Sequence, residues 1–93
     1  MEFGGIEIAE QKGLTSMPQK AASAWIAVEG GIVGAGYKPL VFVGTQTVKG
    51  TNYHFIAEQT LILAEPERHI VKIVVNEFNG EYKIVPHSIE IIY

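Results

Sequence analysis

The sequence predicts an α+β fold, with one N-terminal helix packed across a curved antiparallel sheet of four to five strands. Two observations lead to this prediction. Residues 15–31 carry a single apolar stripe at helical spacing, and residues 37–93 contain four apolar segments separated by short polar connections. A sheet with one apolar face needs a cover, and this chain offers one helix to provide it.

Chain length limits the organisation to a single domain, residues 1–93. Apolar residues make up 47% of the chain and charged residues 18%, which is typical of a small packed domain rather than a disordered one. A chain of this size buries only about 60–65% of its unfolded surface. We therefore expect modest stability.

The helix is expected to begin after Ser16 and to end at Gly30 and Gly31. Ser16 is a candidate N-cap with Gln19 three residues later, the spacing of a capping box, and Pro18 lies in the first turn, where proline is tolerated. Two consecutive glycines end a helix readily. The residues of the apolar stripe are Met17, Ala21, Trp25 and Val28.

Strands are predicted from alternation of apolar and polar residues. In 51–63, one face carries Tyr53, Phe55, Ala57, Leu61 and Leu63, and the other carries His54, Glu58 and Thr60. In 69–78, Val71, Ile73 and Val75 alternate with Lys72 and Asn76, while Ile70 and Val74 make the outer face less polar. The predicted strands are a short one in 3–10, then 37–48, 51–63, 69–78 and 81–93.

The last strand contains a change of phase. Tyr82 and Ile84, before Pro86, are even-numbered, whereas Ile89, Ile91 and Tyr93, after His87, are odd-numbered. A one-residue bulge at these two positions would return both sets to one face, and proline favours an edge strand. The residues concerned are Tyr82, Ile84, Ile89, Ile91 and Tyr93.

Charge and composition argue against several partners. The net charge is −3, all acidic residues are Glu, and the basic residues do not cluster, so no nucleic-acid or membrane-surface partner is expected. No apolar run is long enough to span a bilayer. Without cysteine there is no disulfide or thiolate metal site. The polar N-terminus is unlike a secretory signal, so we expect a cytoplasmic protein, or an extracellular one if a leader was removed before Met1.

Catalytic and cofactor signatures are weak. His54 and Glu58 share a strand face and could hold a metal, but solvated side chains explain them better because no other ligand pattern supports a site. The glycine-rich segment 30–36 follows a helix and precedes a strand, the reverse of a phosphate loop. We expect no cofactor and no enzyme, since none of the serines lies in a nucleophile elbow. These serines are Ser16, Ser23 and Ser88.

The segment "QTVKG", Gln46 to Gly50, joins the first two long strands. It matches Q-x-V-x-G and resembles the first-hairpin motif of the cystatins, and the following "TNY" is similar to the small, cysteine-free stefin type. The opening "MEFGGIEIAE", with Gly4 and Gly5, also resembles the flexible trunk of stefins. The element order of the whole chain matches this family, and the identifiable motifs cover about fifteen residues.

The resemblance implies reversible, tight inhibition of papain-like cysteine proteases by a wedge that fills the active-site cleft. Gly4 and Gly5 would let the trunk approach the cleft closely. Val48 would be an apolar tip on a rigid hairpin, and Gly50 would allow positive φ. Gln46 would hold the loop to itself or to the enzyme. The first-loop residues implied to contact the protease are Gln46, Thr47, Val48, Lys49 and Gly50.

The second loop has two candidates. The family carries it between the last two strands, often as a proline followed by Trp, His or Gly. Here Pro86-His87 has that form, but Asn79-Gly80 has the stronger hairpin signal, with Phe78 as its neighbouring hydrophobe. We favour Asn79-Gly80 because it explains the change of phase as a bulge. Lys49 departs from the small residue that the family often has in the first loop.

A non-inhibitory protein-binding or oligomerising module is the alternative function. An inhibitor should carry its trunk and both loops at one end of the molecule. A binding module should instead show an apolar patch elsewhere, for example at Ile70 and Val74. We expect a monomer or a dimer that exchanges the helix and first strand through an opened first hairpin.

Overall fold

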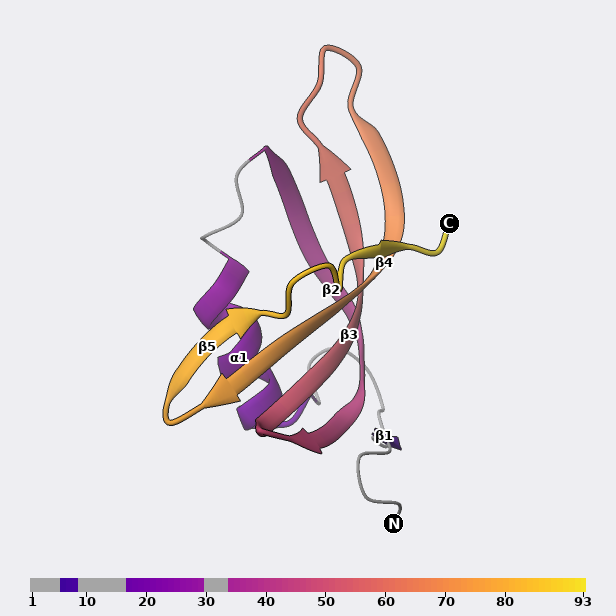
Figure 1. Ribbon diagram of the computed structural model, residues 1–93. Helices are drawn as coiled ribbons and strands as arrows, with labels where there is room; N and C mark the ends of the chain where they lie inside the picture. Colours follow the sequence, from indigo (N-terminus) through magenta and orange to yellow (C-terminus); the bar gives the residue numbers. More distant parts are fainter. Residues whose placement is uncertain (1–5, 9–16, 30–33) are drawn as a thin grey trace.

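The computed structural model describes residues 6–8, 17–29 and 34–93 and shows one helix on an open antiparallel sheet (Figure 1). The predicted α+β class is confirmed. The elements are β1 (Ile6–Ile8), α1 (Gln19–Glu29), β2 (Ala35–Val48), β3 (Gly50–Leu61), β4 (Glu67–Phe78), β5 (Glu81–Ile84) and β6 (Glu90–Ile91).

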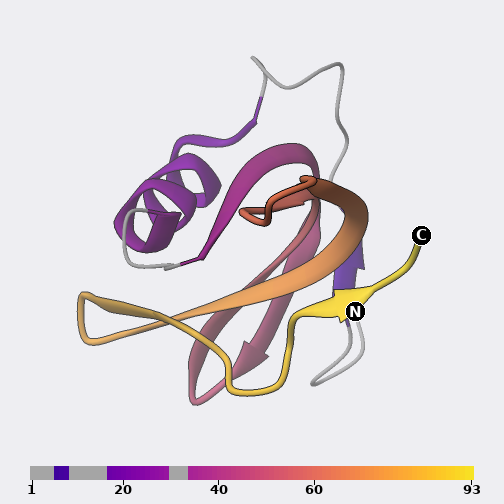
Figure 2. The ribbon, with the colours of Figure 1, turned by 90° about the horizontal axis from the view of Figure 1, so that it is seen from above.

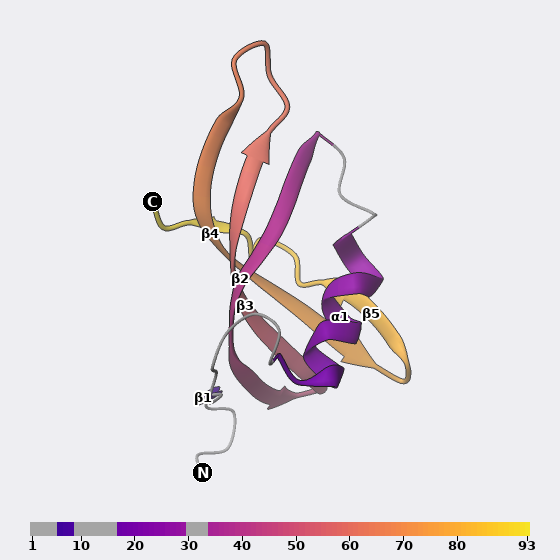
Figure 3. The same ribbon diagram turned by 180° about the vertical axis from the view of Figure 1, so that it is seen from behind.

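The sheet is a meander in the order β1-β2-β3-β4-β5, and β6 returns to pair with β4. Every pairing is antiparallel. Helix α1 contacts β2, β4 and β5 and so covers one face of the sheet, called the inner face here (Figures 2 and 3). The opposite face is called the outer face. A single helix thus provides the predicted cover.

The core lies between α1 and the inner face. Trp25 from the helix meets Phe55 of β3 edge-on, with ring centroids 5.1 Å apart, and Phe42 of β2 packs against Phe55 at 5.6 Å. The predicted helical stripe faces this core, with Met17 partly buried at its edge. Ala24, which was not among the residues of the predicted stripe, is also fully buried, and its small side chain allows close approach of the helix. The buried core residues are Ala21, Ala24, Trp25, Val28, Phe42, Tyr53, Phe55, Ala57, Val71, Ile73 and Val75.

Strand β2 is bent by two irregularities. Its register with β3 shifts between Pro39 and Val41 and again between Phe42 and Gly44. Extra residues in one strand of an antiparallel pair bend that strand and increase its twist. Proline has no N–H for the ladder, so it fits such a position. These two shifts help to curve the sheet around α1.

The helix begins later than the capping pattern predicts. Gln19 is its first residue, and the Pro18 carbonyl accepts the first helical hydrogen bond, from Ala22 N at 3.0 Å. Pro18 therefore precedes the helix instead of lying in its first turn. Ser16 and the stop signal Gly30-Gly31 lie outside the described residues.

The last segment differs from the prediction of one strand with a one-residue bulge. Val75 pairs with Ile84 and Val71 with Ile91, so four steps along β4 correspond to seven along the last segment, which has three extra residues. An odd insertion explains the change of phase. Ile89 packs against the core, but Ile91 is exposed and Tyr93 is 90% exposed. Ile91 lies opposite the inner-face residue Val71, so it shares the predicted face although it is exposed. Tyr93 lies beyond β6 beside Glu58 and Ile70 of the outer face, so the prediction was wrong for that residue.

Leu63 also departs from its prediction. Strand β3 ends at Leu61, and Leu63 is exposed in the connection to β4 instead of lying on the inner face. Within β3, burial alternates as predicted, with Tyr53, Phe55 and Ala57 buried. Gln59 continues this inner face as a buried polar residue, and its Nε2 donates to the Tyr37 hydroxyl at 2.7 Å.

Candidate functional site

The first hairpin turns within three residues, Val48 to Gly50. Val48 pairs with Gly50, and Gly50 has a φ of 84°. A Cβ on Gly50 would overlap the backbone carbonyl of Glu77 on β4. Glycine is therefore required at this position both by backbone conformation and by close approach of a neighbouring strand. The hairpin is seated against β4 and does not project alone into solvent.

A ladder of amide side chains crosses the outer face beneath this turn. Gln46, Asn52 and Asn76 lie directly opposite one another on β2, β3 and β4. Asn52 Nδ2 donates to Gln46 Oε1 at 3.5 Å, and Asn76 Nδ2 donates to Asn52 Oδ1 at 2.9 Å. Asn76 Nδ2 also donates to the Lys49 carbonyl at 3.2 Å, which ties β4 to the turn. The ladder fixes the base of the first hairpin.

Asn52 and Asn76 were not predicted as site residues from the sequence. The pairing of Gln46 with Asn52 could have been predicted, because a hairpin centred on Lys49 places these two residues opposite each other. Asn76 was already predicted to lie on the outer face of its strand. Only the register between β3 and β4 was missing, and five connecting residues left that register open.

Gln46 holds the loop to its own sheet. Its Oε1 lies 3.1 Å from His54 Nε2 as well as near Asn52. Burial lowers the pKa of His54 below its usual value, and the nearby Lys72 ammonium lowers it further. At neutral pH His54 is therefore uncharged, and its Nε2–H donates to Gln46. Of the two roles expected for the Gln46 amide, this contact supports the self-holding one.

The second hairpin turns at Asn79 and Gly80. Their φ angles are 53° and 80°, and Phe78 pairs with Glu81, so the loop has two residues. Positive φ at both positions is the type I′ geometry that Asn-Gly favours. Glu77 Oε2 accepts a hydrogen bond from Gly80 N at 2.8 Å. The predicted hairpin at this position is confirmed.

The two hairpins meet at one end of the sheet, called the hairpin end here. Lys49 Nζ lies 5.3 Å from the centre of the Phe78 ring, a cation–π contact between the two turns. Val48 and Phe78 both expose apolar surface there. Strand β1 starts at the same end, since Ile6 pairs with Gln46 (Figure 1). Gly4 and Gly5 lie outside the described residues.

Pro86 and His87 lie away from the hairpin end. They are the middle residues of a turn closed by Ser88 N donating to Val85 O at 3.1 Å. This turn is pinned to Val74 on the outer face, where Ser88 Oγ accepts from Val74 N at 3.2 Å. The structure thus brings Phe78, Asn79 and Gly80 to the first loop, and it does not bring Pro86 and His87 there.

His54 and Glu58, the pair considered for metal binding, each form a hydrogen bond with another side chain. His54 bonds Gln46, and Glu58 Oε2 accepts from Arg68 Nη2 at 2.7 Å. Among the residues described, no cluster of three or more His, Asp or Glu side chains could hold a metal ion. The described helix is too short to cross a membrane.

Comparisons with protein-family models, curated proteins and solved structures found no match for this chain.

Proposed function

We propose that this protein is a cystatin-like, reversible inhibitor of papain-like cysteine proteases. The observation that carries the proposal is the meeting of the Val48–Gly50 and Asn79–Gly80 turns at the end where β1 begins. A wedge needs its contact segments on one edge, and these segments come from three separated parts of the chain. Phe78 joins Val48 in the apolar part of this edge.

The rigidity of the first hairpin supports the same function. An inhibitor that binds tightly must lose little conformational entropy in the complex. Gly50 is locked against Glu77, and the amide ladder from Gln46 to Asn76 holds the turn from below. Val48 is therefore presented to a partner on a backbone that is already ordered.

The Lys49 contact explains how a charged residue fits within an apolar wedge. Its ammonium group lies over the Phe78 ring. This places the charge at the junction of the two loops and leaves Val48 to enter an apolar subsite. The family often has a small residue at this position. Lys49 is larger, but in this orientation it does not cover Val48, the proposed apolar tip.

The test is a titration of papain activity with a fluorogenic substrate. Wild type is compared with Val48→Asp and with Val41→Asp as a matched control. Val48 is 43% exposed and Val41 is 42% exposed, and both lie on β2, but Val41 is remote from the turn. Both variants should remain folded by circular dichroism, because each charge is placed on an accessible side chain.

We expect wild type and Val41→Asp to inhibit and Val48→Asp to lose at least about tenfold in affinity, since a buried, unpaired carboxylate in the complex is costly. No inhibition by folded wild type at about micromolar concentration would refute the proposal for this enzyme. Equal inhibition by all three proteins would refute the role of Val48.

The alternative, a non-inhibitory binding or oligomerising module, is favoured by a separate observation. Ile62 and Leu63 are exposed in the β3–β4 connection, at the opposite end of the sheet from the two hairpins. If a partner binds there, Ile62→Asp should abolish its binding and Val48→Asp should leave it unchanged. Light scattering of the wild type over a concentration series would separate a monomer from a dimer.

A further inference from the structure

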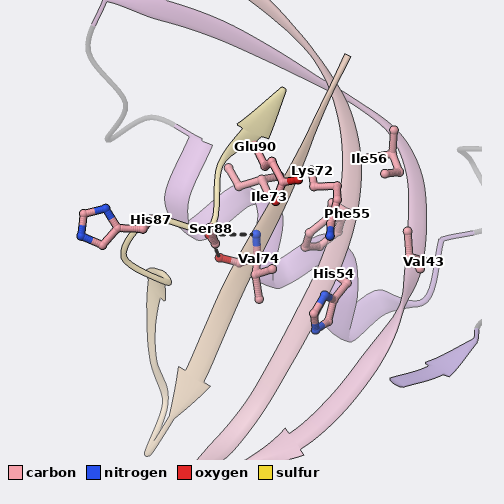
Figure 4. Close-up of a pocket in the computed structure, with 10 residues that line it drawn as sticks. All are labelled: Val43, His54, Phe55, Ile56, Lys72, Ile73, Val74, His87, Ser88 and Glu90. Carbon is pink, nitrogen blue, oxygen red and sulfur yellow. Dashed lines mark hydrogen bonds between the residues drawn. The ribbon is translucent and has the colours of Figure 1, made fainter. Parts of the chain in front are cut away.

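The outer face carries a hollow of about 450 Å³ that the protease contact does not use (Figure 4). Three side chains give it an apolar lining: Val43 from β2, Ile56 from β3 and Val74 from β4. Polar side chains of His87 and Ser88 border it, and three further residues supply the charged or titratable groups considered for a ligand. These are His54, Lys72 and Glu90.

The return of the chain after β5 shapes this hollow. Three extra residues lift the segment between Ile84 and Glu90 away from the ladder, and Ser88 Oγ bonds both backbone polar groups of Val74, at 3.2 and 3.3 Å. The segment therefore stands as a fixed wall beside the outer face of β3 and β4. In Figure 4 the His87 ring points away from the other labelled side chains, so it belongs to the rim.

Lys72 is the cation of the hollow, and its charge is not matched by an ion pair. It lies opposite Glu90 in the register, yet among the described residues its ammonium group makes no salt bridge or hydrogen bond. His54 beside it carries no charge at neutral pH. Its Nε2 is bonded to Gln46, and its ring lines the same hollow.

We propose that this hollow binds a small monocarboxylate with an apolar body. Lys72 pairs with the carboxylate, and Val43, Ile56 and Val74 contact the apolar part. A volume of about 450 Å³ falls within the usual range of small-molecule sites. Glu90 places a negative charge next to Lys72, which disfavours dianions such as phosphate esters and selects ligands with one charge.

The experiment is an NMR titration of the full ¹⁵N-labelled chain with 3-phenylpropionate. Two matched probes are 3-phenylpropionamide, which keeps the shape without the charge, and phenyl phosphate, which carries a higher charge. We expect saturable shifts at the amides of Ile56, Lys72 and Val74 with the carboxylate. The two probes, 3-phenylpropionamide and phenyl phosphate, should bind at least about tenfold more weakly than 3-phenylpropionate.

Variants locate the charge. Lys72→Gln should weaken the binding of 3-phenylpropionate about tenfold, and Lys72→Arg should retain the wild-type affinity. Lys38→Gln, at an exposed lysine of β2 outside the hollow, should bind as wild type does. A bound carboxylate should also raise the pKa of His54 in the wild type, because it offsets the positive charge of Lys72.

Three results would overturn the proposal. The first is the absence of saturable shifts up to about 10 mM ligand. The second is equal affinity for the amide and the carboxylate. The third is equal loss of affinity in Lys72→Gln and Lys38→Gln. Each result is independent of protease inhibition, because neither lysine belongs to the proposed wedge.

Discussion

The two ends of the sheet are built by different means. At the hairpin end, a glycine lies under the Glu77 carbonyl, amides bridge three strands and a lysine caps an aromatic ring. At the opposite end, residues 62–66 join β3 to β4 with exposed Ile62 and Leu63, and a salt bridge between Arg68 and Glu58 lies on the surface. One end is fixed by close backbone contacts and the other mainly by pairing of strands.

This difference bears on function. A surface that must insert into a rigid cleft gains from having its conformation fixed before binding. The hairpin end has this property and the opposite end does not. Substitutions at matched positions should therefore be costly at the first end and mild at the second.

The largest contrast is expected between glycines at the two ends of the β2–β3 pair. Gly50→Ala places a Cβ against the Glu77 carbonyl and also forces alanine into positive φ. We expect the free energy of unfolding to fall by about 2–4 kcal/mol. Gly36→Ala has open space and an ordinary φ, so it should change stability by less than about 1 kcal/mol. Urea unfolding measures both.

Gly80→Ala separates the two causes. Gly80 has a φ of 80° but nothing near its missing Cβ, so only the conformational cost remains, about 1 kcal/mol. If Gly50→Ala costs no more than Gly80→Ala, the close approach of β4 does not constrain the first hairpin. The proposed rigidity of the wedge would then lose its main support.

The next largest effect is expected at the β4 end of the amide ladder. Asn76→Ala removes hydrogen bonds to Asn52 Oδ1 and to the Lys49 carbonyl, so we expect a loss of about 1–2 kcal/mol. Hydrogen exchange at Thr51 should accelerate as the turn loosens. Lys83→Ala is the control, because Lys83 lies opposite Asn76 on β5 and bonds none of the ladder residues. Equal exchange rates in both variants would contradict the role of the ladder.

Sequence periodicity predicted the inner face well because burial imposes a strict alternation on strands. Tyr53, Phe55 and Ala57 on β3, and Val71, Ile73 and Val75 on β4, are buried as expected. The Asn79-Gly80 turn was predictable because its backbone geometry requires those residue types. Local chemistry was sufficient for both features.

Other features depend on contacts between distant segments. An insertion of one residue and an insertion of three residues change the alternation of the last strand in the same way. The sequence therefore could not predict that three extra residues leave the ladder within Val85–Ile89. The position of Gly50 under Glu77 needs the register of three strands. The depth of the outer-face hollow depends on where Ser88 meets Val74, which are fourteen positions apart.

His87 offers a stabilising substitution in the turn that forms the wall of the hollow. Its φ is 62°, and it follows Pro86 at the turn position that glycine ordinarily occupies. His87→Gly should raise the free energy of unfolding by about 1 kcal/mol by removing the left-handed strain. His87→Ala keeps a Cβ and should give no such gain. A gain in both variants would assign the effect to loss of the imidazole instead.

The smallest effect is expected at the surface salt bridge near the opposite end. Arg68 Nη2 and Glu58 Oε2 are 2.7 Å apart, shorter than any contact in the amide ladder, but the Arg68 side chain is 66% exposed. Water and salt screen such a pair, so Arg68→Ala should cost less than about 0.5 kcal/mol, and less still at about 1 M salt. Asn76→Ala should keep its full effect in the same salt, because its bonds are between neutral groups. If Arg68→Ala instead matched Asn76→Ala, distance rather than burial would govern stability here, and the contrast between the two ends would fail.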